Sequence, residues 1–300
     1  MAEGIIREEL EKIQFLCESV LGDSYCEIER MGGLTNHTYH VIMKDTREYV
    51  VRIPGEGTED LIVRADEKIS TELACDLDLD ARCLYFGDDG SKVTEYILNA
   101  VTMSADTLKE DIHIRQIAEI FKKLHTSGVD TGVPFEVFDM AACYEKIIKE
   151  KNVPMYGDYQ EIKDIVIEIK DEIDSVCNIQ MVPCHNDALC ENWVTRGKEG
   201  RMYLIDWEYA GMNDGMWDLA DVSIEAAYDH ETDEKLLKEY LGRDIEDVDR
   251  KHFLANKIYV DFLWTLWAKT RVPYEGEPME DWAAERYVRL KKNINEYQNI

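Results

Sequence analysis

The first third of the chain is rich in short β-forming runs. Two of these runs, 38–43 and 48–53, are joined by four polar residues and predict a hairpin. The hairpin follows a glycine turn, which is itself preceded by a strand-like run. Two further strands are expected at 82–86 and 91–98. A helical spacing of apolar residues at 59–77 separates the two pairs of strands and predicts one helix.

The apolar positions elsewhere follow the period of helices. The N-terminal segment, Met1 to Leu21, alternates Ile, Leu and Val with Glu, Arg and Lys, which predicts an amphipathic helix. Helices then dominate beyond residue 106, and we expect them at 111–127, 139–150, 158–177, 216–228, 231–241, 246–270 and 279–297. Short strands interrupt this helical part near 181–184, 193–195 and 202–206. A β-rich first third followed by a helical remainder predicts an α+β, bilobal, protein-kinase-like fold.

Composition narrows the class of protein. With 45% hydrophobic and 10% aromatic residues, the 300-residue chain can bury a substantial core. A formal net charge of −29 makes nucleic acid an unsuitable partner, because phosphate backbones require clustered Lys and Arg. No stretch approaches the roughly 18 apolar residues that a membrane span requires, so we expect no membrane insertion.

The cysteines and the N-terminus suggest a location. Eight cysteines are scattered without a C-x-x-C pair or a metal-like Cys/His spacing, as is typical of buried thiols in a reducing compartment. The N-terminal helix lacks the apolar core and cleavage site of a signal peptide. We therefore expect a soluble, cytoplasmic protein. Its expected oligomeric state is a monomer or a homodimer.

The strongest local motif is Pro183-Cys184-His185-Asn186-Asp187-Ala188-Leu189-Cys190-Glu191-Asn192. It contains His-x-Asp followed by four residues and Asn, which is the spacing of a kinase catalytic loop. Asp187 is the candidate base that accepts the proton of an acceptor hydroxyl. Asn192 can offer its side-chain carbonyl to Mg²⁺.

A second carboxylate follows at the spacing that a kinase requires. The apolar run Met202-Tyr203-Leu204-Ile205 ends in Asp206, fourteen residues after Asn192, and Asp206 is the second candidate ligand of Mg²⁺. The next residues are Trp207 and Glu208 rather than the Phe-Gly of protein kinases, and no activation segment is recognisable. This combination predicts a kinase that acts on a small molecule.

The candidate nucleotide site lies in the first third. The turn Gly32-Gly33-Leu34-Thr35-Asn36 could bring backbone N–H groups close to phosphates, with Gly32, Gly33, Thr35 and Asn36 as the binding residues. We therefore expect an N-lobe, residues 1–98, that binds ATP. The C-lobe, residues 99–300, is expected to carry the catalytic loop and the acceptor pocket.

Three further features complete the predicted nucleotide site. Arg52 lies mid-strand among apolar residues and can hold phosphates as a permanent, bidentate cation. Its expected partner is Glu67 on the following helix, which we prefer to Glu72. The end of the last strand is the expected hinge, where the backbone of Glu95 and Ile97 would bond the adenine edge.

Together these motifs resemble those of the choline/ethanolamine kinases, over about residues 25–290. The glycine turn, Arg52, the His185–Asn192 loop and Ile205-Asp206-Trp207-Glu208-Tyr209 carry the resemblance, which is closest to the bacterial choline kinases. The same motifs occur in aminoglycoside and thiamine phosphotransferases. The resemblance therefore implies that the protein requires ATP and Mg²⁺. It also implies that residues in the C-terminal third determine which acceptor is bound.

The resemblance also implies an acceptor pocket for choline. The residues that match the family's pocket are an acid and four aromatic side chains: Glu225, Tyr228, Trp264, Trp267 and Trp282. A trimethylammonium group has no N–H to donate, so aromatic faces select it through cation–π attraction of about 0.5–2 kcal/mol per ring. Where the family often has a tyrosine, this chain has His230, which leaves one wall of the pocket open.

Alternative functions remain open at this point. Other small acceptors, namely ethanolamine, thiamine or an aminoglycoside, would use the same catalytic motifs. A pseudokinase that only binds its partners is disfavoured by the intact Asp187, Asn192 and Asp206. A protein kinase is disfavoured by the missing activation segment.

Overall fold

The computed structural model describes residues 6–31, 36–55 and 62–300. The chain divides into two compact units. The first unit joins Met1–Met103 to Glu191–Ala210, and the second joins Ser104–Cys190 to Gly211–Ile300. The first unit thus extends beyond the expected N-lobe of residues 1–98 and includes a second, later segment of the chain.

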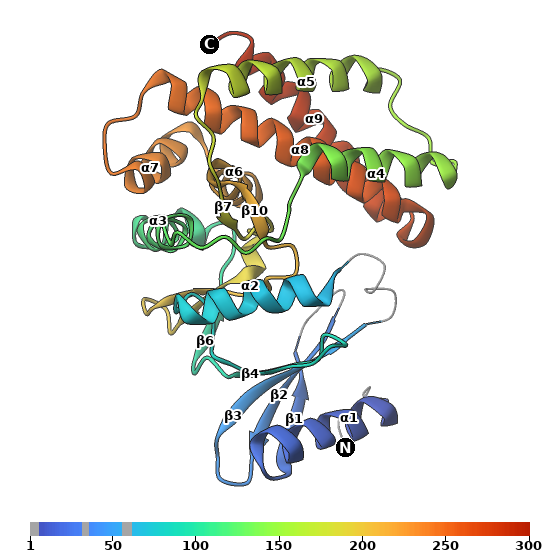
Figure 1. The fold of residues 1–300 in the computed structure, drawn as a ribbon, viewed down its shortest axis with the longest axis vertical. Coiled ribbons are helices and arrows are strands. Elements are labelled where there is room, and N and C mark those ends of the chain that lie inside the picture. The colour runs from blue at the N-terminus through green and yellow to red at the C-terminus, as the bar shows by residue number, and fades with distance from the viewer. Residues whose placement is uncertain (1–5, 32–35, 56–61) are drawn as a thin grey trace. The chain divides into compact units, whose positions relative to one another are not determined.

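A five-stranded antiparallel sheet forms the centre of the first unit (Figure 1). Its strands lie in the order β1-β2-β3-β5-β4. Their bounds are β1 Tyr25–Arg30, β2 Asn36–Met43, β3 Glu48–Pro54, β4 Cys83–Phe86 and β5 Lys92–Glu95. The expected hairpin is confirmed, since Ile42 pairs with Glu48 and Thr38 with Arg52 across β2 and β3.

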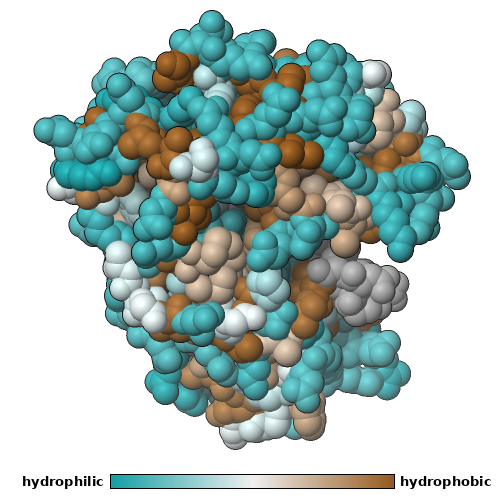
Figure 2. All heavy atoms as spheres, turned by 45° about the horizontal axis from the view of Figure 1, so that its top comes forward, coloured by the Kyte–Doolittle hydropathy of each residue, from teal (hydrophilic) through white to brown (hydrophobic). Residues whose placement is uncertain are grey.

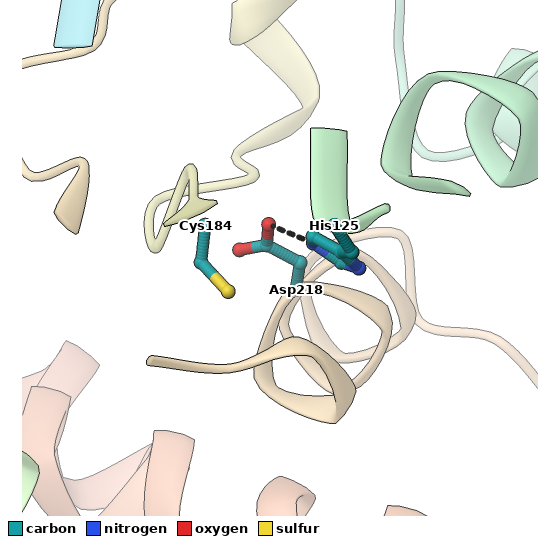
Figure 3. A group of neighbouring side chains, drawn as sticks. All are labelled: His125, Cys184 and Asp218. Atoms are coloured by element: carbon teal, nitrogen blue, oxygen red, sulfur yellow. Dashed lines mark hydrogen bonds and ion pairs between the residues drawn. The ribbon is translucent and has the colours of Figure 1, made fainter. Parts of the chain in front are cut away.

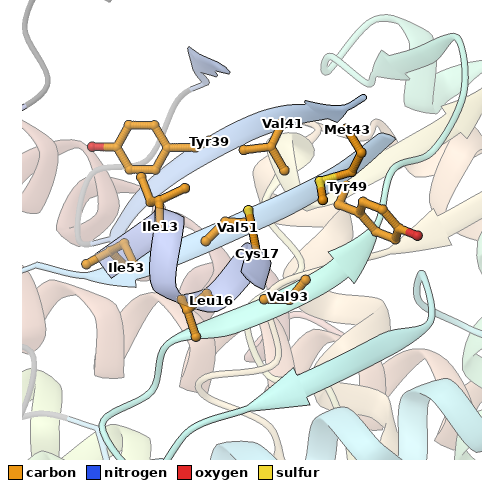
Figure 4. Packing of buried hydrophobic residues seen from close by; sticks show 10 residues of the cluster. All are labelled: Ile13, Leu16, Cys17, Tyr39, Val41, Met43, Tyr49, Val51, Ile53 and Val93. Carbon is orange, nitrogen blue, oxygen red and sulfur yellow. The ribbon is translucent and has the colours of Figure 1, made fainter. Parts of the chain in front are cut away.

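Helix α1 (Arg7–Leu16) and the π-helical turn that follows it (Cys17–Leu21) cover one face of this sheet. Figure 4 shows Ile13, Leu16 and Cys17 of this segment against Tyr39 and Val51 of the strands. All five side chains are at most 2% exposed. The amphipathic pattern of the N-terminal segment therefore buries its apolar stripe against the strands, as a period of 3.6 residues allows.

The rest of the first unit carries helix α2 and a second, small sheet. Helix α2 (Arg64–Asp76) buries Glu67, Ser70 and Ala74. The small sheet has the order β6-β8-β9, with β6 at Ala100–Thr102, β8 at Trp193–Arg196 and β9 at Met202–Leu204. Because β6 pairs with β8, the segment Glu191–Ala210 is fixed to the first part of the chain.

The second unit is mainly helical (Figure 1). Its helices are α3 Asp111–His125, α4 Val137–Glu150, α5 Tyr159–Val176, α6 Gly215–Glu225, α7 His230–Leu241, α8 Asp247–Glu275 and α9 Glu277–Tyr297. Two short antiparallel strands, β7 (Met181–Cys184) and β10 (Gly211–Asp214), pair within this unit. The long helices α8 and α9 pack along each other, and α8 also packs against α4, α5 and α6.

Local sequence explains where several of these helices begin. Asp214 caps α6 by accepting from the N–H of Met216, and Asp229 caps α7 by accepting from the N–H of Thr232. Helix α8 begins with a reciprocal capping box between Glu246 and Asp249. The α+β class is confirmed: the sheets and helices follow the order that the hydrophobic pattern predicts.

Hydrophilic side chains cover most of the face drawn in Figure 2, with small hydrophobic patches between them. This agrees with a chain in which 32% of the residues are charged. Among the helices of the described ranges, none is both long enough and apolar enough to cross a membrane.

Candidate active site

The catalytic-loop motif follows β7 directly in the second unit. His185 and Asn186 are fully buried, whereas Asp187 is partly exposed. Asn186 has a φ of 68°, a left-handed conformation in which Asn is tolerated better than most residues. This bend in the backbone lies between the buried side chain of His185 and the partly exposed side chain of Asp187.

Helix α6 holds this loop through the carboxylate of Asp218, which is fully buried. Its Oδ2 accepts the N–H of His185 at 2.8 Å, and its Oδ1 accepts the N–H of Asn186 at 2.8 Å. Trp217, the preceding residue, donates its indole N–H to the carbonyl of Asn186 at 3.1 Å. Hydrogen bonds to a charged acceptor are the strong class, so Asp187 is displayed on a firmly anchored backbone.

Asp221 extends the anchor by one helical turn. Its Oδ2 accepts the N–H of Ala188 at 2.5 Å. Burial, reinforced by the nearby carboxylates of Glu225 and Asp187, raises the pKa of Asp221 well above its usual range. The charged form of this buried acid is therefore disfavoured, and the residue lies on α6 between Asp218 and Glu225.

His125, Cys184 and Asp218 lie close enough together to resemble a metal site (Figure 3). However, both nitrogens of His125 already have partners: Tyr240 Oη at 2.9 Å and Asp218 Oδ2 at 3.0 Å. Both oxygens of Asp218 hold loop amides, and burial raises the pKa of the Cys184 thiol well above its usual value, which disfavours the thiolate. This group is better explained as a structural anchor.

In the first unit, the two predicted metal ligands lie at the same end of the β8–β9 hairpin. Trp193 pairs with Leu204, and one step further the carbonyl of Asn192 accepts the N–H of Ile205 at 2.9 Å. Asp206 follows with a φ of 68°, and its Oδ1 is buried without a hydrogen-bond partner among the described residues. The amide oxygen of Asn192 and the carboxylate of Asp206 are ligand types that fit Mg²⁺.

Arg52 and Glu67 form the ion pair expected from the sequence. Arg52 Nη1 lies 2.5 Å from Glu67 Oε1, and these two side chains are 6% and 0% exposed. Arg52 Nη1 also lies 3.6 Å from Oδ1 of Asp206. Burial opposes ionisation of Glu67, but Arg52 outweighs it and lowers the pKa of the carboxyl group. Arg52 is therefore held between a helix acid and the candidate metal ligand.

A second arginine, which the sequence analysis did not single out, joins this network. Arg64 Nη1 lies 2.6 Å from Glu67 Oε2 and 3.6 Å from Glu208 Oε2. Asn36 donates to the same Glu208 oxygen at 3.0 Å. Burial and the charge of Asp206 raise the pKa of Glu208 to about 7. Of the residues predicted for the glycine turn, Asn36 lies within the described ranges, whereas Gly32, Gly33 and Thr35 lie outside them.

The predicted hinge follows β5. Glu95 donates its N–H to the carbonyl of Arg82 at 3.0 Å, and the carbonyl of Ile97 accepts the N–H of Ala100 at 3.1 Å. The carbonyl of Glu95 and the N–H of Ile97 are the groups that an adenine edge would use. Their part in binding remains a prediction.

Three predicted pocket residues form one indole cluster in the second unit. Trp264 and Trp267 share a face of α8, and their ring centroids are 6.1 Å apart in a T-shaped arrangement. Trp282 of α9 lies 6.0 Å from Trp267, also T-shaped. Trp264 is 5% exposed, whereas Trp267 and Trp282 are intermediate. The structure therefore brings Trp282 against Trp267, from which it is 15 residues away in the sequence.

The other two predicted pocket residues have partners of their own. Glu225 forms an ion pair with Arg286 of α9, which is 3% exposed. The guanidinium of Arg286 also lies over the ring of Trp282, 3.9 Å from its centroid. Tyr228 is buried and donates its hydroxyl to the carbonyl of Leu108 at 2.6 Å. Glu225 is thus tied to the indole cluster through an arginine that the sequence analysis left without a role.

Several important residues of the site were missed at the sequence level. Asp218, Asp221 and Arg286 had no assigned role, although α6 carries a signal that could have revealed two of them. Its sequence, GMWDLADVSIE, is largely apolar and places two acids three residues apart, on one face. Acids buried in such a helix need partners, and backbone N–H groups of the loop supply them.

The comparisons with known proteins agree with this geometry. The family model for choline/ethanolamine kinase matches residues 28–268. Protein LicA of Haemophilus influenzae is 28% identical over 274 residues, which cover 89% of this chain and 79% of that protein.

Solved structures of other kinases have a similar fold. The structure of choline kinase LicA from Streptococcus pneumoniae has a TM-score of 0.82 and 32% identity, and the match covers 97% of this chain and 100% of that one. A spectinomycin phosphotransferase, solved with ADP and spectinomycin, has a TM-score of 0.66 at 10% identity, covering 97% and 98% of the two chains, which shows a shared fold alone. This chain is a small-molecule kinase with a protein-kinase-like fold, and it belongs to the choline/ethanolamine kinase family.

Proposed function

We propose that the protein transfers the γ-phosphoryl group of ATP to the hydroxyl group of choline. The observation that carries this proposal is a continuous series of neighbours inside the second unit. It runs from Asp187 through Asp221 and Glu225 to Arg286, and from there to the indole of Trp282. A candidate base and an aromatic pocket for a cation therefore belong to one compact body.

Asp187 is the proposed catalytic base. The choline hydroxyl oxygen forms a bond to the γ-phosphorus while the bond from that phosphorus to the leaving oxygen of ADP breaks. The hydroxyl proton passes to the carboxylate of Asp187. Since the loop amides on both sides are anchored to Asp218 and Asp221, the carboxylate needs little reorganisation to reach its working position.

The first unit supplies the residues proposed for ATP and the metal ion. Arg52 would hold phosphates, Asn36 and the glycine turn would cover them, and Glu95 and Ile97 would bond the base. Asn192 and Asp206 would hold Mg²⁺, which when bound neutralises charge on the phosphates. Glu67 keeps the buried guanidinium of Arg52 in place, which is the role of an orienting acid.

The indole cluster is the proposed site for the trimethylammonium group. The rings of Trp264, Trp267 and Trp282 offer π-faces, each worth about 0.5–2 kcal/mol to a cation. Glu225 is tied to the edge of the cluster through Arg286, and Tyr228 is the proposed fourth aromatic residue of the pocket. A quaternary amine has no N–H group that needs a hydrogen-bond acceptor, so cation–π contacts with the indole rings are sufficient to bind it.

Turnover measured by coupled ADP detection tests this proposal, with choline, ATP and Mg²⁺ as reactants. Asp187→Asn should lower kcat by about 10²–10⁴-fold and leave ATP binding nearly unchanged. Asp139→Asn, at an exposed position of α4, is the matched control and should behave as wild type. Formation of phosphocholine should be seen by phosphorus NMR, and its absence with wild-type protein would reject choline as the acceptor.

Ethanolamine is the second candidate acceptor, because the matching family model covers both kinds of kinase. The indole cluster favours choline, since a primary ammonium gains less from aromatic faces than from carboxylate oxygens. Replacing Trp264 and Trp267 together by Leu should raise the KM for choline more than the KM for ATP. An equal effect on the two KM values would argue against these rings as the acceptor site.

A further inference from the structure

Arg286 occupies an unusual place for a buried cation. It lies on α9, and its Nη2 contacts Oε1 of Glu225 while its Nη1 lies 3.2 Å from Oδ1 of Asp261. Its guanidinium covers one face of Trp282. A single side chain therefore touches both the acid and one of the rings that we propose for the acceptor.

The acids around Arg286 are compensated by arginines. Asp261 is fully buried and receives Arg289 through Nε at 2.8 Å and Nη2 at 2.7 Å, in addition to Arg286. Two guanidinium groups thus face the two carboxylates of Glu225 and Asp261, and their formal charges sum to zero. Burial and the neighbouring carboxylates raise the pKa of Asp221, the next acid along α6, which disfavours its charged form.

This balance has different consequences for the two kinds of amine. A primary ammonium carries three N–H donors, and removing them from water is costly unless carboxylate or carbonyl oxygens replace the water. With Oε1 of Glu225 held by Arg286, fewer such oxygens are offered. A trimethylammonium group has no donor to satisfy, and it gains attraction from the indole faces that remain.

We propose that Arg286 is a specificity-determining residue, which favours a quaternary over a primary ammonium substrate by occupying Glu225 and one face of Trp282. This inference rests on the proposed function, because it assigns the acceptor to the indole cluster. It extends that function by naming the residue that sets the choice between choline and ethanolamine. Arg286 is a positioning residue: it acts through Glu225 and Trp282.

Replacing Arg286 by Met tests the inference. The methionine fills similar space against Trp282 but leaves Glu225 without its cation, so a primary ammonium can now use both oxygens. The ratio of kcat/KM for choline to kcat/KM for ethanolamine should fall at least about tenfold, mainly through a lower KM for ethanolamine. Arg286→Lys, which restores one charged contact to Glu225, should return the ratio to within about threefold of wild type.

Arg289→Met is the matched control, because Arg289 shares Asp261 with Arg286 but has no contact with Glu225 among the described residues. It should leave the choline-to-ethanolamine ratio unchanged within about twofold, even if the Tm falls. Should Arg286→Met fail to fold, Arg286→Gln keeps a neutral donor to Glu225 and should shift the ratio in the same direction by a smaller factor. Calorimetric titration of the variants with choline and with ethanolamine gives a second readout that does not depend on turnover.

The outcomes separate the two claims. Wild-type protein that phosphorylates neither amine would reject the proposed function. Wild-type turnover of choline, together with a ratio that Arg286→Met leaves unchanged, would reject the role of Arg286 alone. The same fall in the ratio for Arg289→Met as for Arg286→Met would also reject it, because general loosening of α9 would then explain the result.

Discussion

Asp218→Asn is the most direct test of how α6 holds the catalytic loop. The fully buried Asp218 accepts two loop amides, at 2.8 Å each, and lies 3.0 Å from Nε2 of His125. Asparagine has the same shape but only one acceptor oxygen. Its NH₂ group would therefore face the N–H of either His185 or Asn186, donor against donor.

The size of the effect follows from these contacts. A buried backbone N–H left without an acceptor costs about 1–3 kcal/mol, and each hydrogen bond to a charged group is worth about 1.5–3 kcal/mol. We expect the variant to lose about 2–4 kcal/mol of unfolding free energy, which corresponds to a fall in Tm of roughly 5–15 °C. Because Asp187 follows the anchored amides directly, kcat should also fall, by about tenfold or more.

Asp221→Asn is the matched control for this experiment. Asp221 lies on the same helix, is 1% exposed and also accepts a loop amide, from Ala188. Asparagine keeps one acceptor oxygen, which is enough for the single loop amide that Asp221 holds. The variant should lose less than about 1 kcal/mol of unfolding free energy.

Urea unfolding near pH 7 and ADP-coupled turnover measure both effects in the same preparations. An Asn variant of Asp218 that unfolds within about 0.5 kcal/mol of wild type would show that Asp218 does not anchor the loop. An Asp221→Asn variant as damaging as Asp218→Asn would also contradict this role. In that case any polar change in α6 would be harmful, and the count of acceptors on Asp218 would explain nothing.

Three further variants test other buried charges. Glu67→Gln removes the carboxylate that Arg52 and Arg64 share and should lower the free energy of unfolding in urea by about 3–5 kcal/mol, whereas Glu72→Gln on the exposed side of α2 should change it by less than about 0.5 kcal/mol. Burial raises the pKa of Asp80 to about 6, so the folded state keeps a proton that the unfolded chain releases above about pH 4. The contribution of the protonated Asp80 to the free energy of unfolding is fully present below about pH 4 and is lost as the pH rises toward 6. In urea unfolding measured across that pH range, Asp80→Asn should abolish up to about 3 kcal/mol of this loss. Lys269→Met should lower the unfolding free energy by less than about 2 kcal/mol in thermal unfolding, because its partner Glu280 is 40% exposed and can be hydrated; a larger loss would show that the pair is effectively buried.

Most elements could be predicted because burial imposes a period on the sequence. The strands β2 and β3 and the long helices α5 and α9 lie within a few residues of their expected bounds. The three- and four-residue strands β6 and β10 were not expected. Helix α8 continues to Glu275, past the expected end at residue 270, and includes Pro273, which has no N–H to donate in the last turns.

In the site, too, contacts that follow from the local sequence could be predicted, whereas contacts that depend on the packing of distant helices could not. The pairing of Arg52 with Glu67 could be predicted, because a strand cation in an apolar run needs an acid and the following helix offers only a few. The contacts of Arg286 could not, since they depend on how α6, α8 and α9 pack together. Glu225 was expected as the acid of the acceptor pocket, and sequence spacing gave no indication that an arginine 61 residues away would pair with it.

The overall acidity of the protein and the charge balance around Glu225 have separate effects. A net charge of −29 attracts any small cation over long range, and salt screens that attraction with a Debye length of about 8 Å at physiological ionic strength. It acts equally on choline and ethanolamine, which carry the same charge. Discrimination has to arise where water is removed, and there the acids Glu225 and Asp261 are matched by Arg286 and Arg289. Local neutrality beside aromatic rings, within a strongly acidic protein, is therefore what favours the amine that has no hydrogen bonds to donate.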